Sequence, residues 1–292
     1  MYNKKISEED IKQNSINQVS KIKFAIAIGN YLSPNAPFPL GNELEVNFAK
    51  AKKYGYQAIE LHNIREPKKV NVSNLINLCN NYSLKISAIS TGLPNYVDKL
   101  SLIDDSSTII EKSLIRLNEY VDLASILKSF IIIGTIRGNL PDELSHCKYE
   151  KRLANSIKKI SEYAKYKKVT LLIEAANRYE TNYLNKADEI INFINKYNIK
   201  MLKIHLDTFH MNIEESNIYK SIINTGNLLG YFHVSDSNRM YPGAGHIDFK
   251  TVRDALLKIN YQGYIGVECF PIPDSDTAAK KAIQNIKTIF EK

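Results

Sequence analysis

Four side chains of the kinds that bind metal ions stand at the ends of short apolar segments in the C-terminal half of the chain. They are Glu174 in VTLLIEAANRYE, Asp207 in LKIHLDTFHMN, His233 in YFHVSDSNR and Glu268 in YIGVECF. Three carboxylates and one imidazole form an oxygen-rich ligand set, which suits a divalent cation such as Mn²⁺, Mg²⁺ or Co²⁺. One such residue alone is more often structural, but four in equivalent positions indicate a metal site.

Eight short apolar or β-branched segments alternate with helical patterns along the chain. Strands are predicted over 24–28, 57–61, 85–90, 130–134, 170–174, 202–207, 230–234 and 264–268. Helices are predicted over 43–53, 73–80, 107–127, 150–165, 186–197, 213–225, 249–259 and 277–290. Alternating strands and helices form parallel sheets, and eight repeats predict closure into a (β/α)8 barrel. We therefore predict an α/β fold with a single TIM-barrel domain over residues 21–292, after a polar N-terminal extension over residues 1–20.

The barrel would bring the four candidate ligands together, because the C-terminal ends of all its strands open into one mouth. Side chains two residues apart share a face of a strand, so Asp207 and His205 point inward together. Each candidate ligand is predicted to be the last inward-facing residue of its strand, with His205 as a core residue one layer below. Asn212 and Asp248 are expected to cap the helices that follow them.

The composition excludes several classes of protein. The chain is 44% hydrophobic and 24% charged, and it has no apolar run near the eighteen or so residues that a membrane helix needs. The polar N-terminus lacks the apolar core of a secretory signal, so we expect a cytoplasmic protein without a membrane partner. A net charge of +8 is spread along helix faces, which argues against a nucleic-acid partner.

Four motifs carry a resemblance to a known family over about residues 170–270. The motifs are IEAANRYE, LDTFHMNIEE, FHVSDSNRMYPGAGHIDF and GYIGVECF. They resemble the ketose 3-epimerase branch (D-tagatose and D-psicose 3-epimerases) of the xylose-isomerase-like TIM barrels. The resemblance implies one divalent metal ion, with Mn²⁺ expected first and Co²⁺ or Mg²⁺ next, a small-molecule sugar substrate and a homo-oligomer.

The resemblance also implies a role for each site residue. Its metal ligands would be Glu174, Asp207, His233 and Glu268, and its substrate residues Glu180, His210 and Arg239. Epimerisation beside a ketone removes a proton from one face of a carbon and returns one to the other face, so a carboxylate on each face can act in turn as base and acid. Glu174 and Glu268 are the expected pair. We predict a divalent-metal-dependent sugar epimerase that works through an enediolate on a ketose or keto-acid sugar.

Two further residues are expected at the barrel mouth. The segments SAISTG, LSLID and IIIGTIRG resemble members that act on keto-acid sugars, such as 5-keto-gluconate epimerases. Arg137 ends the fourth predicted strand, where a guanidinium could bind a substrate carboxylate with two hydrogen bonds. His62 follows the second strand and is expected to contact the substrate. Arg137 has a salt bridge to a neighbouring loop as its structural alternative.

Other readings stay open at this point. His233 could be a core histidine, His210 a packing residue, and Glu180 with Arg239 a surface salt bridge of little energetic value. An aldose–ketose (1,2) sugar isomerase uses the same metal site and is the alternative activity. An abasic-site endonuclease shares the barrel, but it requires a multinuclear zinc site with more histidines than these strands supply.

Overall fold

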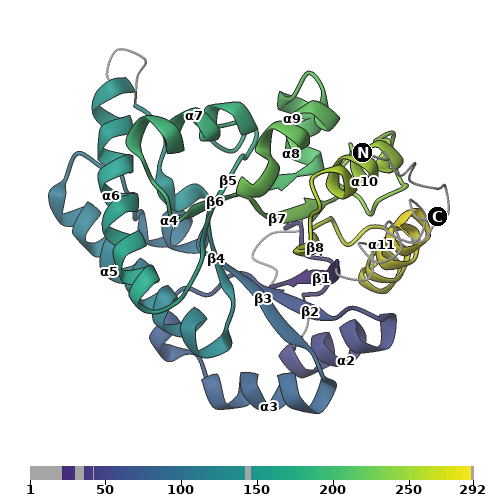
Figure 1. Cartoon of the computed structure of the whole chain (residues 1–292). Coiled ribbons are helices and arrows are strands. Elements are labelled where there is room, and N and C mark those ends of the chain that lie inside the picture. Colours follow the sequence, from purple (N-terminus) through teal and green to yellow (C-terminus); the bar gives the residue numbers. More distant parts are fainter. Residues whose placement is uncertain (1–21, 30–35, 42, 142–145, 291–292) are drawn as a thin grey trace, which may run out of the picture.

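The computed structural model describes residues 22–29, 36–41, 43–141 and 146–290, and their strands form one closed parallel barrel in chain order (Figure 1). The eight strands are β1 (Lys23–Ile28), β2 (Ala58–Leu61), β3 (Lys85–Ser90), β4 (Phe130–Ile133), β5 (Leu171–Glu174), β6 (Leu202–Asp207), β7 (Leu229–Val234) and β8 (Tyr264–Val267). The predicted fold and its eight strands are confirmed, with strand ends shifted by one residue at most. The predicted extension over residues 1–20 lies outside the described residues.

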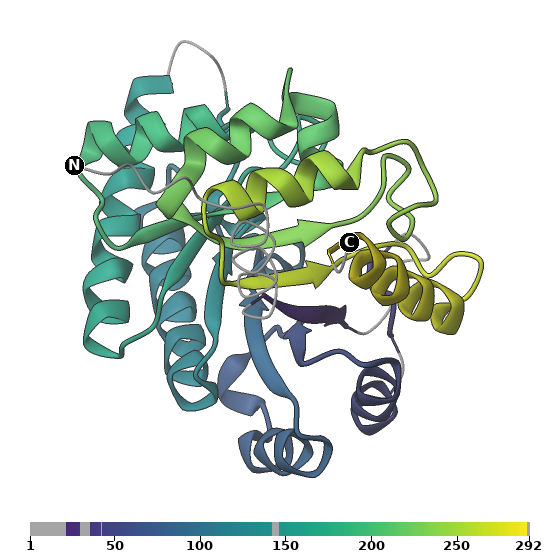
Figure 2. The same cartoon turned by 45° about the vertical axis from the view of Figure 1, so that its right-hand side comes forward.

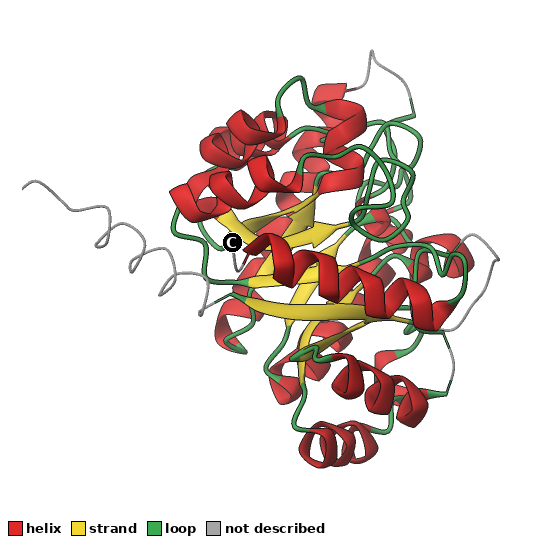
Figure 3. Ribbon diagram, turned by 90° about the vertical axis from the view of Figure 1, so that its right-hand side faces the viewer, coloured by secondary structure: helices red, strands yellow, loops and turns green. Residues whose placement is uncertain are grey.

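Helices surround the strands on all sides (Figures 1 and 3). The α-helices are α2 (Leu44–Tyr54), α3 (Val72–Tyr82), α4 (Leu93–Asp98), α5 (Ser107–Leu127), α6 (His146–Tyr166), α7 (Ala187–Tyr197), α8 (Thr208–Glu214), α9 (Ile218–Thr225), α10 (Phe249–Lys258) and α11 (Ser275–Phe290). Short 3-10 helices are η1 (Pro67–Lys69), η2 (Thr135–Arg137) and η3 (Gly226–Leu228). Within the described parts of the chain, no helix has the length and apolar character needed to cross a membrane.

The single helix predicted over 213–225 is wrong, because two shorter helices occupy this part of the chain. Helix α8 begins directly after β6, and the Asp207 carboxylate caps it by accepting the N–H of Phe209. Asn212 therefore lies inside α8 and caps nothing, whereas Asn217 caps α9. An acidic residue at a strand end took the capping role that sequence reasoning gave to Asn212. The predicted cap at Asp248 is confirmed.

The two ends of the described chain meet where the barrel closes. Strand β1 pairs with β8, and Ala25 lies opposite Gly266. The last helix, α11, packs against both α10 and α2, so the yellow and purple ends of the colour scale lie side by side in Figure 2. Closure removes free strand edges and gives every strand two hydrogen-bonded neighbours.

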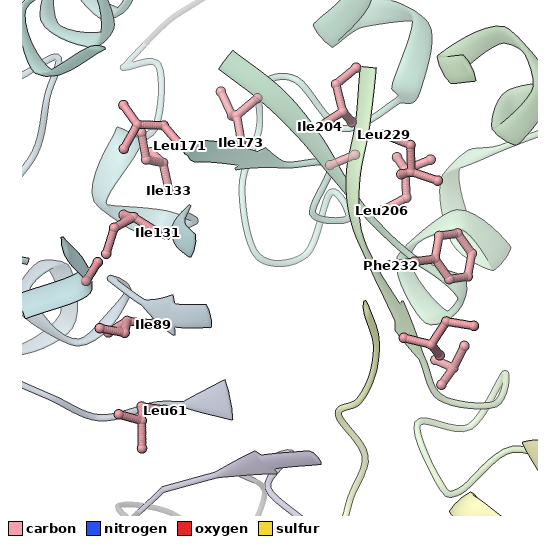
Figure 4. Packing of buried hydrophobic residues seen from close by; sticks show 14 of the residues in the cluster. Leu61, Ile89, Ile131, Ile133, Leu171, Ile173, Ile204, Leu206, Leu229 and Phe232 are labelled. Carbon is pink, nitrogen blue, oxygen red and sulfur yellow. The ribbon is translucent and has the colours of Figure 1, made fainter. Parts of the chain in front are cut away.

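Two apolar layers hold the strands in place. Outward-facing apolar side chains such as Ile204, Leu206 and Phe232 fill the space between sheet and helices (Figure 4). A smaller cluster of Ala88, Ile132, Leu172 and Tyr231 fills the interior of the barrel. The outer residues are fully buried, and truncating such a leucine to alanine costs about 2–5 kcal/mol in stability. This apolar interior is the floor on which the polar site stands.

Candidate active site

A cavity of about 500 Å³ opens at the C-terminal ends of the strands. It is lined by Ala36, Pro37, Phe38, His62, Asn63, Ser90, Gly92, Leu93, Tyr96, Val97, Gly134, Thr135, Glu174, Glu180, Arg239 and Glu268. Its volume falls in the range of small-molecule sites. Both glutamates of the predicted acid–base pair line this cavity, together with aromatic and aliphatic side chains from the segments that follow β1 and β3.

Three of the predicted ligands meet at the base of this cavity. Asp207, His233 and Glu268 each offer a ligand atom, and these atoms lie within 4.8 Å of one another. The Nδ1 atom of His233 is 3.8 Å from Glu268 Oε2. His233 Nδ1 and Asp207 Oδ2 are both buried and have no hydrogen-bond partner among the described residues. Buried polar atoms are normally satisfied, so two orphaned ligand atoms facing two carboxylates fit a bound divalent cation.

The fourth predicted ligand, Glu174, ends β5 and joins an overlapping group with His205 and His233. Its Oε1 atom lies 3.5 Å from His210 Nε2 and 3.9 Å from His205 Nδ1. His205 is fully buried, which confirms the predicted core position. Neither of its ring nitrogens has a partner in the part of the chain that the structure describes. Sequence reasoning placed His205 in the correct layer but did not foresee its contact with Glu174.

His210 lies on α8 with its ring directed at Glu174. Its Nδ1 atom accepts a hydrogen bond from the Asn177 amide nitrogen at 2.7 Å, and the amide oxygen accepts the N–H of Tyr179. An amide nitrogen can only donate, so this arrangement assigns the ring proton of His210 to Nε2, the nitrogen that faces Glu174. His210 is only 1% exposed and is not part of the cavity wall. Sequence reasoning missed Asn177, which lies in the predicted IEAANRYE motif.

The Glu180–Arg239 pair belongs to the cavity, and the alternative of a surface salt bridge is wrong. Arg239 Nη1 donates to Glu180 Oε1 at 2.6 Å, and its Nη2 donates to Glu268 Oε2 at 3.3 Å. The Arg239 side chain is 14% exposed and lies over the ring of Phe209, 4.9 Å from the centroid. The guanidinium therefore joins a predicted substrate residue to a predicted catalytic one.

His62 lines the cavity as predicted and packs against Phe38, with ring centroids 4.6 Å apart. Its Nε2 atom is 2.6 Å from Glu60 Oε1, and the second Glu60 oxygen is 2.6 Å from His233 Nε2. Glu60 is fully buried. Sequence reasoning missed Glu60, although it shares the inward face of β2 with His62 and the strand period could have found it.

The predicted position of Arg137 at the barrel mouth is wrong. The residue ends η2, a short 3-10 helix that follows β4, and its side chain is fully buried. Its Nη1 atom donates to the main-chain carbonyl of Glu174, and Nη2 donates to Thr181 Oγ1. Both of these acceptors are uncharged. In this arrangement Arg137 supports the backbone around Glu174 and is not one of the residues that line the cavity.

The electrostatic environment separates the two glutamates of the expected acid–base pair. Burial is the largest effect on each carboxyl and acts to raise its pKa. For Glu174, the hydrogen bond with His210 and the charges of nearby imidazoles outweigh burial, so its pKa lies well below the usual value. For Glu268, burial prevails over the attraction of His233 and Arg239, so its pKa is raised. Carboxyl pairs with pKa values pushed apart are typical of acid–base sites.

Two buried histidines of the site also have pKa values shifted in opposite directions. Burial lowers the pKa of His205 to about 3, with His233 acting in the same direction, so this ring is neutral at physiological pH. Burial also acts to lower the pKa of His233, but attraction by Glu60 is stronger, and the pKa rises to about 10. The carboxylates next to His233 therefore favour a positive charge at the base of the cavity.

Comparison with known proteins places these features in a family. A family model described as "Xylose isomerase-like TIM barrel" matches residues 48–289. An L-ribulose 3-epimerase from Methylomonas sp. (strain DH-1) is 32% identical over 260 residues, which cover 82% of this chain and 89% of that protein. A ketose 3-epimerase from Arthrobacter globiformis is 30% identical over 224 residues, covering 76% of this chain and 75% of that protein. A solved structure of L-ribulose 3-epimerase superposes with a TM-score of 0.80 at 26% identity, covering 92% of this chain and 95% of the other.

Proposed function

The chain belongs to the xylose isomerase-like TIM barrel family, in its ketose 3-epimerase branch, and we propose that it inverts C3 of a small uncharged ketose with the help of a divalent metal ion. The observation that carries this proposal is the buried Asp207–His233–Glu268 cluster at the base of a sugar-sized cavity. Glu174 flanks the cluster from another strand, and two ligand atoms in it have no partner among the described residues.

We propose that Glu174, Asp207, His233 and Glu268 hold one divalent ion, with Mn²⁺ as the first candidate and Co²⁺ or Mg²⁺ next. Such an ion would polarise the substrate ketone and stabilise the negative charge that develops on its oxygen. The mixture of three carboxylates and one imidazole is suited to these ions. The chain's own side chains must then bind the sugar, exclude water and move the proton.

Proton transfer is assigned to the two glutamates that line the cavity. Glu174 takes the C3 proton from one face and Glu268 returns a proton to the other, because both carboxylates line the cavity and come from different strands. The roles exchange for the reverse reaction, as microscopic reversibility demands. The Nε2–H of His210 stabilises the negative charge of Glu174. Arg239 donates hydrogen bonds to both Glu180 and Glu268 and so fixes their relative positions. Phe38 and Leu93 supply an apolar wall that limits access of water.

The charges around the cavity favour an uncharged sugar over a keto-acid or a sugar phosphate. Arg239 is the single guanidinium or ammonium among the described cavity-lining residues, and it is already paired with Glu180 and Glu268. Glu174 adds a third carboxylate to the wall. Apart from the proposed metal ion, an anionic substrate would find no unpaired cationic side chain on the described cavity wall, which is unfavourable in a partly desolvated site. We therefore withdraw the keto-acid expectation, which came from the resemblance of SAISTG, LSLID and IIIGTIRG and from the expected role of Arg137.

A panel of free ketoses, keto-acid sugars and ketose phosphates tests the proposal. The Mn²⁺-loaded protein is incubated with each compound, and products are identified by NMR. We expect C3 epimers of one or more free ketoses, with weaker turnover of their anionic counterparts. An aldose product would instead assign the 1,2-isomerase activity, and inversion of keto-acids alone would contradict the argument from charge.

A further inference from the structure

The carboxylate of Glu60, on β2 beneath the cavity, is bonded to two imidazoles at once. Its Oε2 atom lies 2.6 Å from His233 Nε2 and its Oε1 atom 2.6 Å from His62 Nε2. Glu60 is 0% exposed, and no lysine or arginine among the described residues pairs with it. A buried carboxylate is costly unless its charge is compensated, so both histidines must serve this purpose.

This contact determines which nitrogen of His233 can bind an ion. A carboxylate accepts hydrogen bonds, so the bonding assigns a proton to Nε2 of His233. The remaining nitrogen, Nδ1, is buried without a partner in the described structure and faces Glu268. Histidine ligands commonly donate their second N–H to a carboxylate, which sets the ring orientation and makes the ligating nitrogen more basic.

The surroundings of His233 leave its ring little freedom to turn. The ring of His205 stands edge-on to it with centroids 4.2 Å apart, and the ring of Tyr231 lies on another side at 5.4 Å. A Cβ atom at Gly266 would lie 2.8 Å from His233 Cδ2, so a glycine is required here. The Tyr231 hydroxyl is itself held by Ser87 Oγ at 2.8 Å. Packing therefore restrains the His233 ring, and the hydrogen bond from Nε2 to Glu60 fixes its orientation.

We propose that Glu60 is a positioning residue: it directs Nδ1 of His233 to the metal ion and ties His62, on the cavity wall, to the same carboxylate. This inference rests on the metal site of the proposed function. If so, both the binding of the metal ion and the position of the His62 side chain depend on the buried carboxylate of Glu60. A change at Glu60 should then alter both metal affinity and the apparent affinity for sugar.

Glu60→Gln tests the proposal with almost no change in shape. The amide has one acceptor oxygen and one donor nitrogen, so only one of the two imidazoles can still donate to it, and the other must turn an unprotonated Nε2 toward the amide N–H. We expect the dissociation constant for Mn²⁺, measured by competition with a fluorescent chelator, to rise about 10- to 100-fold. The visible absorption of the Co²⁺-loaded variant should also shift. Glu150→Gln is the matched control, because Glu150 is a buried carboxylate on α6 that pairs with Lys196 at 2.8 Å, away from the site.

The outcomes separate this inference from the proposed function. A folded Glu60→Gln variant with wild-type Mn²⁺ affinity and an unchanged Co²⁺ spectrum would overturn the role of Glu60 and leave the epimerase proposal intact. Failure of the wild type to bind Mn²⁺ or Co²⁺ would overturn both.

A second measurement uses the wild-type chain, so it stands even where the variant does not fold. In protein with ¹⁵N-labelled histidine and bound Zn²⁺, NMR should show His233 coordinated through Nδ1 and protonated at Nε2. Assignment comes from comparison with His233→Asn. Coordination through Nε2 would overturn the inference.

Discussion

Glu174 and Glu268 reach the cavity from β5 and from the end of β8, which lie on different sides of the barrel mouth. Their surroundings differ as much as their positions do. The Nε2 atom of His210 lies 3.5 Å from Glu174 Oε1, whereas Arg239 donates a hydrogen bond to Glu268. The two carboxyls are therefore not interchangeable, and each can be tested by itself.

Glu174→Gln and Glu268→Gln should each lower kcat by several orders of magnitude while the fold is kept. Loss of general acid–base catalysis alone is worth about 10²- to 10⁴-fold, and weakened metal binding adds to it. Steady-state kinetics at saturating Mn²⁺ gives the effect, and circular dichroism checks folding. Glu111→Gln, at an exposed glutamate on α5, serves as control. Near wild-type turnover in either variant would remove that residue from the pair.

The path of the proton gives a second test at this scale. With one base on each face, the proton removed by Glu174 is not the proton that Glu268 returns. Product formed in D₂O should therefore carry deuterium at the inverted carbon from the first turnover, and recovered substrate should gain label more slowly. NMR of early product measures both. Unlabelled product would indicate a single base.

At the scale of the elements, small residues on the strands allow the bulky site residues to pack. Strand β8 contributes Gly266 directly beside His233 and Tyr231. Gly134, after β4, plays a similar part beside Glu174, because a Cβ atom there would lie 3.1 Å from Glu174 Oε2. Close contact with the rings of His233 and Tyr231 requires a glycine at 266, whereas a side chain at 134 would press on the end of the Glu174 side chain.

Gly266→Ala should weaken metal binding, because the added methyl group would displace the His233 ring from its position beside Asp207 and Glu268. The new Cβ would lie 2.8 Å from His233 Cδ2 and 2.9 Å from Tyr231 Cε1. Overpacking of this kind costs about 1–3 kcal/mol in stability. The Mn²⁺ dissociation constant and thermal unfolding measure the two effects. In the control Gly226→Ala nothing lies within 4 Å, so its positive φ should affect stability alone. Equal Mn²⁺ affinity in both variants would contradict the packing argument.

The loop between β5 and α7 is held by a second set of contacts. Glu214, on α8, accepts the backbone N–H of Arg178 at 2.7 Å and pairs with its guanidinium at 2.8 Å. Thr181, in the same loop, accepts from Arg137. The loop carries Glu180 into the cavity, so α8 and η2 together determine where a substrate residue lies.

Glu214→Gln should make stability less sensitive to acid. The Arg178 side chain is the main cause of a lowered pKa at Glu214. A carboxyl with a depressed folded-state pKa contributes stability above its unfolded-state pKa, about 4.3, and loses it as pH falls through the folded-state value. Urea unfolding at pH 7 and at pH 3.5 should show a smaller loss in the variant than in wild type or Glu111→Gln. An equal loss in all three would refute this role.

At the scale of the whole molecule, the negative charge gathered at one end of the barrel is the dominant feature. Glu60, Glu174, Asp207 and Glu268 lie together in the barrel interior and its mouth, although the chain as a whole carries a net charge of +8. Repulsion among buried carboxylates opposes folding, and a divalent cation relieves it. Metal binding should thus stabilise the fold as well as supply the chemistry.

EDTA should abolish activity, and Mn²⁺, Co²⁺ or Mg²⁺ should restore it. Because the ion binds the folded state, a concentration of 100 times the dissociation constant should add about 2.7 kcal/mol to the free energy of unfolding. Calorimetry with and without metal measures the shift, and the Asp207→Asn variant should lose most of it. Full activity in a rigorously metal-free preparation would disprove the metal-dependent mechanism.

The barrel and the positions of the candidate metal ligands could be predicted from the sequence because both depend on local periodicity. Alternation along a strand places Asp207 and His205 on one face, and apolar segments between helical patterns mark the strand ends. Cap selection was less predictable, since Asp207, Asn212 and Asn217 are all suitable N-cap types. In the structure Asp207 caps α8 and Asn217 caps α9, because α8 begins directly after β6.

The sequence by itself indicated the strand ends at which Glu174, Asp207, His233 and Glu268 stand. Tertiary structure decided which further residues join them and which atoms each side chain presents to its neighbours. Glu60 and His233 are 173 residues apart, and their bond exists only because the barrel brings β2 and β7 to one interior. The turn at η2 buried Arg137 for the same reason, since its direction depends on contacts with Glu174 and Thr181. Side-chain alternation is a property of one strand, whereas hydrogen bonds inside a closed barrel depend on all eight strands at once.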